Sequence, residues 1–78
     1  MKINEILKII STALELKEGA LSIDSNMDDF ESWDSLGHLS ILVALDKNID
    51  GNISEISELA TADSVSKIVA ILKQYDFL

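Results

Sequence analysis

The chain has 78 residues, with 6 basic and 14 acidic side chains and a formal net charge of −8 at pH 7. Its length predicts one small domain over residues 1–78 and disfavours a deep enzyme cleft. The acidic excess disfavours nucleic acid and anionic lipid and favours partners with basic surfaces. The absence of cysteine excludes disulfides, thiolate metal sites and a cysteine nucleophile.

Hydropathy along the chain indicates where the protein resides. No run approaches the roughly 18 apolar residues of a membrane span, and charged residues interrupt the apolar ones near the amino terminus. We therefore expect a soluble, cytoplasmic protein without a membrane span. We also expect a monomer.

Helical spacing of apolar residues predicts a first helix over residues 3–16, and Gly19 suits its C-terminal stop. Its expected buried stripe comprises Ile3, Ile6, Leu7, Ile10, Ala13 and Leu14. Residues 20–33 lack a sustained period and are rich in Ser and Asp, which predicts a long ordered loop. The apolar residues that could hold this loop on the core are Leu21, Ile23, Met27, Phe30 and Trp33.

A second helix is predicted over residues 35–48, with a broad buried face. The expected members of that face are Leu39, Ile41, Leu42, Leu45 and Ile49. Leu36 and Val43 lie on its flank near Leu39, so the helix is more apolar than packing on one side requires. We interpret this excess as a candidate docking surface.

The last third of the chain predicts two further helices. A short third helix is indicated by Ile53, Ile56, Leu59 and Ala60. A fourth, with Thr61 or Asp63 as its N-cap, is indicated by Val65, Ile68, Val69, Leu72 and Tyr75. The predicted fold is an all-α four-helix bundle with a long loop between helices 1 and 2 and a short third helix.

Ser35 begins the predicted second helix, where backbone N–H groups lack intrahelical partners and the helix dipole is positive. A phosphate at this position is stabilised, so Ser35 is a candidate for modification by another enzyme. A simpler interpretation is that Ser35, Asp34 or Ser32 only caps the helix. The residues before Ser35 form a run of acids without a base: Glu18, Asp24, Asp28, Asp29, Glu31 and Asp34.

Residues 33–39, Trp-Asp-Ser-Leu-Gly-His-Leu, together with the apolar run 41–45, resemble the phosphopantetheine-attachment region of acyl carrier proteins. The resemblance extends over nearly the whole chain in the order and length of the expected elements. It implies that a phosphopantetheinyl transferase attaches 4′-phosphopantetheine from coenzyme A to Ser35. It further implies a non-catalytic protein that carries acyl or aminoacyl groups as thioesters, the cofactor supplying the chemistry.

The resemblance also assigns roles to neighbours of Ser35. It implies that Asp34 caps the helix, or helps to orient Ser35 or the metal-bound coenzyme, and that enzymes with basic docking surfaces contact the second helix. The expected contact residues are Leu36, Leu39, Val43 and Asp46. Carriers of fatty acid synthesis have more acids along this helix, whereas Asp46 is the one acid here after Ser35. The motif is closer to stand-alone carriers of specialised or polysaccharide pathways.

His38 and Gly37 each allow two interpretations. His38 follows Ser35 by three residues, so its side chain could approach a phosphate, or it could be a packed or half-exposed residue. Gly37 lowers helix propensity but permits close approach of another backbone. The sequence does not choose between them.

Two other functions stay open at the sequence level. Residues 46–57 reproduce the start of an EF-hand calcium loop, although Ser57 stands where a bidentate Glu is needed, and no second loop is present. Alternatively, the chain is a modification-free adaptor that uses the surface of Leu36 and Val43, with Ser35 as a cap. The resemblance implies no resident metal.

Overall fold

Helices account for the regular secondary structure that the computed structural model describes, which covers residues 2–49 and 53–78. The α-helices are α1 (Ile3–Ala13), α2 (Ser35–Asn48) and α3 (Val65–Gln74). Three short 3₁₀ helices accompany them: η1 (Met27–Asp29), η2 (Ile53–Glu55) and η3 (Ser57–Thr61). Within the described ranges there is no β-strand, and the prediction of an all-α class is confirmed.

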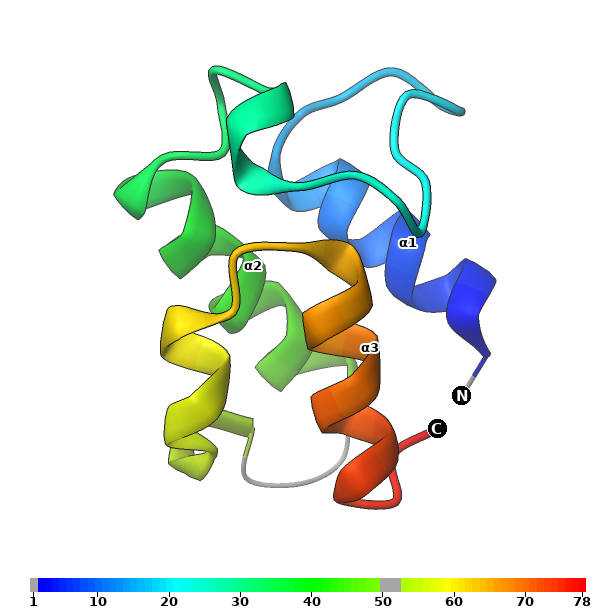
Figure 1. Cartoon of the computed structure of the whole chain (residues 1–78), viewed down its shortest axis with the longest axis vertical. Coiled ribbons are helices and arrows are strands. Elements are labelled where there is room, and N and C mark those ends of the chain that lie inside the picture. The colour runs from blue at the N-terminus through cyan, green and yellow to red at the C-terminus, as the bar shows by residue number, and fades with distance from the viewer. Residues whose placement is uncertain (1, 50–52) are drawn as a thin grey trace.

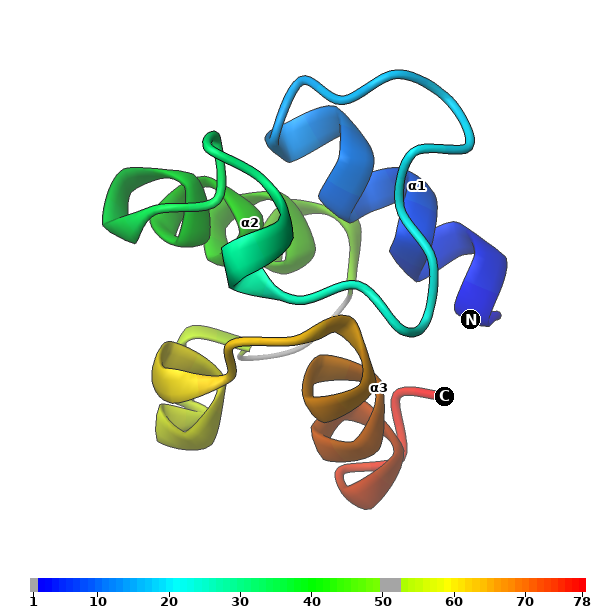
Figure 2. The ribbon, with the colours of Figure 1, turned by 45° about the horizontal axis from the view of Figure 1, so that its top comes forward.

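The three α-helices enclose one hydrophobic core (Figure 1). α2 packs against α1 and against η2 and η3, while α3 packs against α1 and η3 (Figure 2). The long connection between α1 and α2 passes over one end of the helices, at the top of Figure 1. The Cα radius of gyration is 11.1 Å, about the value expected for a compact chain of this length.

The predicted four-helix bundle is wrong in its third member, because η2 and η3 are 3₁₀ helices separated by the extended residue Ile56. The reason lies in the spacing of the buried residues, since Ile53, Ile56 and Leu59 are three positions apart. A 3₁₀ helix has three residues per turn, so this spacing suits short 3₁₀ turns. Three α-helices are therefore present in the described residues.

Aliphatic side chains and a single tryptophan fill the core. The buried hydrophobic residues are Ile6, Ile10, Leu14, Leu21, Trp33, Ile41, Leu45, Ile49, Ile53, Ile56, Leu59, Ala62, Val65, Ile68, Val69 and Leu72. In the loop, Leu21 and Trp33 are buried and Met27 and Phe30 half-buried, as predicted, but Ile23 is exposed. The exposed residues also include Ile3 and Tyr75, which were both expected in helix stripes.

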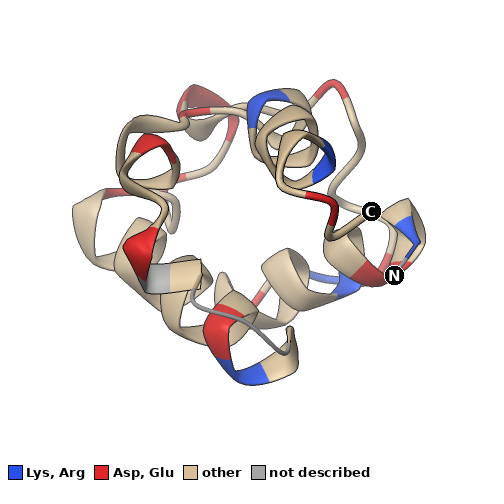
Figure 3. Cartoon of the chain, turned by 90° about the horizontal axis from the view of Figure 1, so that it is seen from below, with Lys and Arg blue, Asp and Glu red and all other residues tan. Residues whose placement is uncertain are grey.

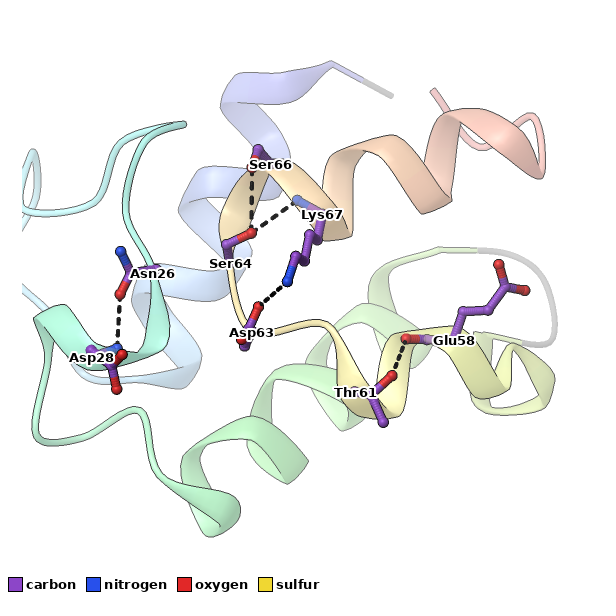
Figure 4. A network of polar contacts seen from close by, with 8 residues as sticks. All are labelled: Asn26, Asp28, Glu58, Thr61, Asp63, Ser64, Ser66 and Lys67. Atoms are coloured by element: carbon purple, nitrogen blue, oxygen red, sulfur yellow. Dashed lines mark hydrogen bonds and ion pairs between the residues drawn. The ribbon is translucent and has the colours of Figure 1, made fainter.

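Two helix boundaries differ from the prediction. α1 ends at Ala13 rather than at residue 16, because Glu15 adopts a left-handed conformation with φ of 57°. Gly19, the expected stop, also has positive φ, at 83°, but lies in the turn that follows. The N-cap of α3 is Ser64 rather than Thr61 or Asp63, and its hydroxyl accepts a hydrogen bond from the Lys67 amide at 3.2 Å (Figure 4).

The long loop is held against the start of α3 by backbone hydrogen bonds. The Met27 N–H donates to the Asp63 carbonyl at 2.8 Å, and the Val65 N–H donates to the Ser25 carbonyl at 3.0 Å. Within the loop, the Asn26 side chain accepts from the Asp28 amide at 3.0 Å and caps η1 (Figure 4). The loop is therefore ordered, as the sequence predicts, and it delivers the chain to the first turn of α2.

Candidate functional site

Ser35 is the first residue of α2, and its side chain is exposed. The side-chain hydrogen bonds found among residues 2–49 and 53–78 do not involve its hydroxyl. The helix is 14 residues long, so its amino-terminal end presents unpaired backbone N–H groups and a positive dipole. These are the conditions that favour a phosphate ester at this position.

Asp34 is the N-cap of α2. Its Oδ1 accepts a hydrogen bond from the Gly37 amide at 2.8 Å, and its backbone carbonyl accepts from the His38 amide at 2.8 Å. The capping interpretation therefore applies to Asp34, which leaves the hydroxyl of the next residue, Ser35, available. Ser32 lies before the cap and is not part of α2.

Gly37 is the point at which α2 meets the loop most closely. A Cβ placed on Gly37 would collide with the Ser32 carbonyl oxygen and would lie 3.0 Å from Cδ2 of Leu14. The Ser32 oxygen is backbone, so it cannot swing away as a flexible side chain would. The interpretation that Gly37 permits close approach is confirmed, and the first turn of α2 is thereby packed against the end of the loop.

His38 turns into the protein and is buried, with 8% of its surface exposed. Its Nδ1 accepts a hydrogen bond from Trp33 Nε1 at 3.1 Å, and its Nε2 lies 2.7 Å from the Leu59 carbonyl oxygen. Of the two interpretations offered by the sequence, the packed residue is confirmed. The imidazole links the end of the loop to α2 and η3.

An exposed apolar strip runs down α2 from the turn that carries Ser35. Leu36 is 76% exposed, Leu39 56% and Val43 47%. The prediction that Leu39 belongs to the buried face is wrong. The buried residues of α2, which packs against α1 and η3, are His38, Ile41 and Leu45. The strip borders an open groove between α2 and α1 that is lined by Thr12, Ala13, Leu39, Ser40, Val43, Ala44, Lys47 and Asn48.

Acidic residues are distributed over several elements of the molecule, and basic ones are few (Figure 3). All six acids of the run before Ser35 are exposed, and so is Asp46 on α2. Lys47 follows Asp46 and borders the groove beside α1. Asp34 thus places a negative charge at the amino-terminal end of α2, and Asp46 and Lys47 give the other end of the helix a mixed charge.

Two ionisable groups with shifted pKa values lie on the η3 and α3 side of the molecule. The Asp63 carboxylate accepts a hydrogen bond from Lys67 Nζ at 2.7 Å, and this bond holds the pKa of Asp63 below its ordinary value of 3.8 (Figure 4). The Tyr75 hydroxyl donates to the Glu58 carboxylate, which raises the pKa of Tyr75 above its ordinary value of 10.0. Neither residue adjoins Ser35 in sequence.

The EF-hand-like segment is only partly described, because Asp50, Gly51 and Asn52 lie outside the described residues. Its third position, Asn48, belongs to α2, and the Asn48 side-chain amide donates to the Ala44 carbonyl at 2.7 Å. Across residues 2–49 and 53–78, no group of three or more His, Cys, Asp or Glu side chains is placed to hold a metal ion.

None of the described helices is both long and apolar enough to cross a bilayer.

The sequence pattern did not predict the connection between Trp33, His38 and Leu59. A signal for part of it was available, because a buried indole N–H usually has a hydrogen-bond partner and His38 is the one histidine of the chain. The contact with the Leu59 carbonyl depends on where η3 lies, which local spacing does not specify.

Comparison of the chain with protein-family models, with curated proteins and with solved structures gave no match.

Proposed function

We propose that this chain is a carrier of the acyl carrier protein type, in which Ser35 is the attachment point of 4′-phosphopantetheine. The observation that carries the proposal is the exposed serine at the start of α2, preceded by a capping aspartate and followed by an exposed apolar strip. The attached group would supply a thiol that holds acyl or aminoacyl cargo as a thioester. The chain itself is then non-catalytic and presents the cargo to other enzymes.

The residues around Ser35 fit a phosphodiester. Asp34 takes the Gly37 amide, so the cap does not depend on the serine hydroxyl. The hydroxyl is exposed, and the positive end of the helix dipole offsets part of the negative charge that a phosphate brings. Modification of Ser35 therefore requires neither unfolding of α2 nor loss of its cap.

The order of the elements supports the same proposal. A carrier of this type is expected to have a first helix, a long loop, a second helix, a short third helix and a final helix. Here α1, the loop, α2, the pair η2 and η3, and α3 follow one another in that order. We propose that η2 and η3 together correspond to the short third helix of such a carrier.

The proposed partners are a phosphopantetheinyl transferase and enzymes that load or receive acyl or aminoacyl groups. The strip of Leu36, Leu39 and Val43 offers them apolar contact, and Asp46 and the acids before Ser35 offer contacts to basic side chains. We propose a monomer that works in the cytoplasm. Its pathway is either fatty acid synthesis or a specialised pathway with a stand-alone carrier.

The test is intact-protein mass spectrometry after incubation with coenzyme A, magnesium and a promiscuous phosphopantetheinyl transferase. The unmodified chain should gain the mass of one phosphopantetheine, and Ser35→Ala should gain nothing. Ser40→Ala is the matched control, because Ser40 is also an exposed serine of α2 and should leave loading intact. Absence of any gain with several active transferases would overturn the proposal.

The exposed strip on α2 also suits a second function, that of an adaptor that binds an enzyme without modification. The two proposals differ in what they require of Ser35. An adaptor should keep its biological activity in Ser35→Ala, and its stability should stay within about ±0.5 kcal/mol, because Asp34 rather than Ser35 caps α2. A carrier should lose cofactor loading and pathway function together, so a complementation assay with Ser35→Ala separates them.

A further inference from the structure

A buried chain of two hydrogen bonds connects three parts of the fold next to Ser35. Trp33 Nε1 donates to His38 Nδ1 at 3.1 Å, and His38 Nε2 lies 2.7 Å from the Leu59 carbonyl oxygen. The indole and imidazole planes are within 7° of parallel, with centroids 6.2 Å apart. Because the indole N–H points outward in its own ring plane, the two rings lie edge to edge, and the contact is a hydrogen bond rather than face-to-face stacking.

The partners of His38 determine which of its nitrogens carries the proton. The indole nitrogen of Trp33 can only donate, and the Leu59 carbonyl can only accept. His38 must therefore accept at Nδ1 and donate at Nε2, and the neutral Nε2–H tautomer alone satisfies both partners. All three groups are at least nine-tenths buried, so water cannot replace a lost bond without rearrangement.

Ser35 lies between the two rings in the sequence. Trp33 precedes it by two residues and His38 follows it by three, and both rings are fixed to each other. The backbone between them is held by the Asp34 cap on the Gly37 amide and by the contact of Gly37 with the Ser32 carbonyl. The exposed hydroxyl thus stands on a turn whose two ends are anchored in the core.

We infer that Trp33 and His38 are positioning residues for the modification of Ser35. Through the Leu59 carbonyl they fix the first turn of α2 relative to η3, so that the hydroxyl is offered to the modifying enzyme in one orientation. This inference rests on the proposed function. It adds to that function a role for two residues that are buried rather than exposed at the surface around Ser35.

The physical link is tested first without any enzyme, by amide hydrogen exchange of the full chain. His38→Leu removes both hydrogen bonds, and Trp33→Phe removes the donor to Nδ1. Both should speed exchange at the Gly37 amide by about tenfold or more, because the cap turn loses its anchor. Ile68→Val is the control, because it destabilises the core at a buried position on α3. It should leave exchange at the Gly37 amide unchanged after correction for global stability.

Loading of Ser35 is the second measurement, made at a temperature at which all variants are folded. His38→Leu and Trp33→Phe should lower kcat/KM of the transferase for this protein by about tenfold to a hundredfold, since misplaced reacting groups lose rate. The KM for coenzyme A should not change, and Ile68→Val should load at the original rate. His38→Gln retains a donor for the Leu59 carbonyl, so its kcat/KM should lie between that of His38→Leu and that of the unmodified chain.

The outcomes separate this inference from the proposed function. Normal loading of His38→Leu together with unchanged Gly37 exchange would overturn the positioning role while leaving the carrier proposal intact. If the unmodified chain takes up no phosphopantetheine, the proposed function fails. In that case faster exchange at Gly37 in His38→Leu would still support the physical link between the buried rings and the Ser35 turn.

Discussion

Asp34 and Gly37 close the first turn of α2 through a hydrogen bond from the Gly37 amide to Asp34 Oδ1 at 2.8 Å. We predict that Asp34→Ala lowers the free energy of unfolding by about 0.5–2 kcal/mol, because an amide of the first turn loses its acceptor. Asp34→Ser should retain most of the stability. Chemical denaturation of the three proteins measures both effects, and equal stability of the alanine variant would show that the cap is dispensable.

Gly37→Ala should destabilise the protein, although alanine normally favours a helix over glycine by up to about 1 kcal/mol. The reason is the collision of the new Cβ with the Ser32 carbonyl and its approach to Leu14. Ser66→Ala, an exposed substitution within α3, provides a comparison that should stay within about ±0.5 kcal/mol. A melting temperature for Gly37→Ala at or above the original would contradict this packing.

Leu36→Ala and Val43→Ala should leave stability within about ±0.5 kcal/mol, because both side chains are largely solvent-exposed. We expect the same variants to raise the KM of the transferase for this protein. Ile41→Ala, on the buried face of the same helix, should instead lose about 2–5 kcal/mol of stability. Equal loading kinetics in Leu36→Ala, Val43→Ala and the unmodified chain would remove the strip from the docking surface.

The Asp63–Lys67 pair should make stability depend on pH at the acid end. The hydrogen bond from Lys67, and then its positive charge, lower the pKa of Asp63 below 3.8. Because the pKa of Asp63 is lower in the folded protein, the contribution of the pair to stability is present above the unfolded pKa. It is lost as the pH falls through the folded pKa. Because the pair is exposed, we expect the effect to be small and weakened by salt.

NMR titration of the Asp63 carboxyl measures this directly. In Lys67→Gln the pKa of Asp63 should rise toward 3.8, because the principal donor and charge are both removed. No change in the pKa of Asp63 between the two proteins would mean that the pair does not form in solution.

Tyr75 should make stability depend on pH at the alkaline end, with the opposite sign to Asp63. Its hydroxyl donates to the Glu58 carboxylate, and this bond raises the pKa of Tyr75 above 10.0. The contribution to stability is therefore present below the unfolded pKa and is lost as pH rises through the folded one. Tyr75 is the one tyrosine of the chain, so tyrosinate absorbance follows it, and Glu58→Gln should lower its pKa.

The helical class and the two long helices were predictable because apolar residues repeat with an α-helical period over many turns. The start of α2 at Ser35 was predictable as well, since Asp34 is a strong cap residue. Replacement of the third α-helix by η2 and η3 was not predicted. The spacing of Ile53, Ile56 and Leu59 suits a three-residue turn, but over so short a segment it also fits an α-helical stripe.

The environment of individual residues on α2 was harder to predict. Leu39 and His38 adjoin in sequence, and hydropathy assigns the leucine to the core and leaves the histidine undecided. The structure buries the histidine and exposes the leucine, because Trp33 and the Leu59 carbonyl satisfy both nitrogens of the ring. Such a result depends on partners distant in sequence, whose positions are set only by the complete fold.

The backbone bonds that join the long loop to the start of α3 have a consequence for how the chain folds. Helical bonds join neighbours four residues apart, whereas the bonds from Met27 to Asp63 and from Val65 to Ser25 span the whole middle of the chain. Closing so long a segment loses chain entropy before any contact compensates for it. The part of the loop around residues 25–27 can therefore make these bonds only when residues 63–65 lie beside it, so its order depends on contacts between distant parts of the chain.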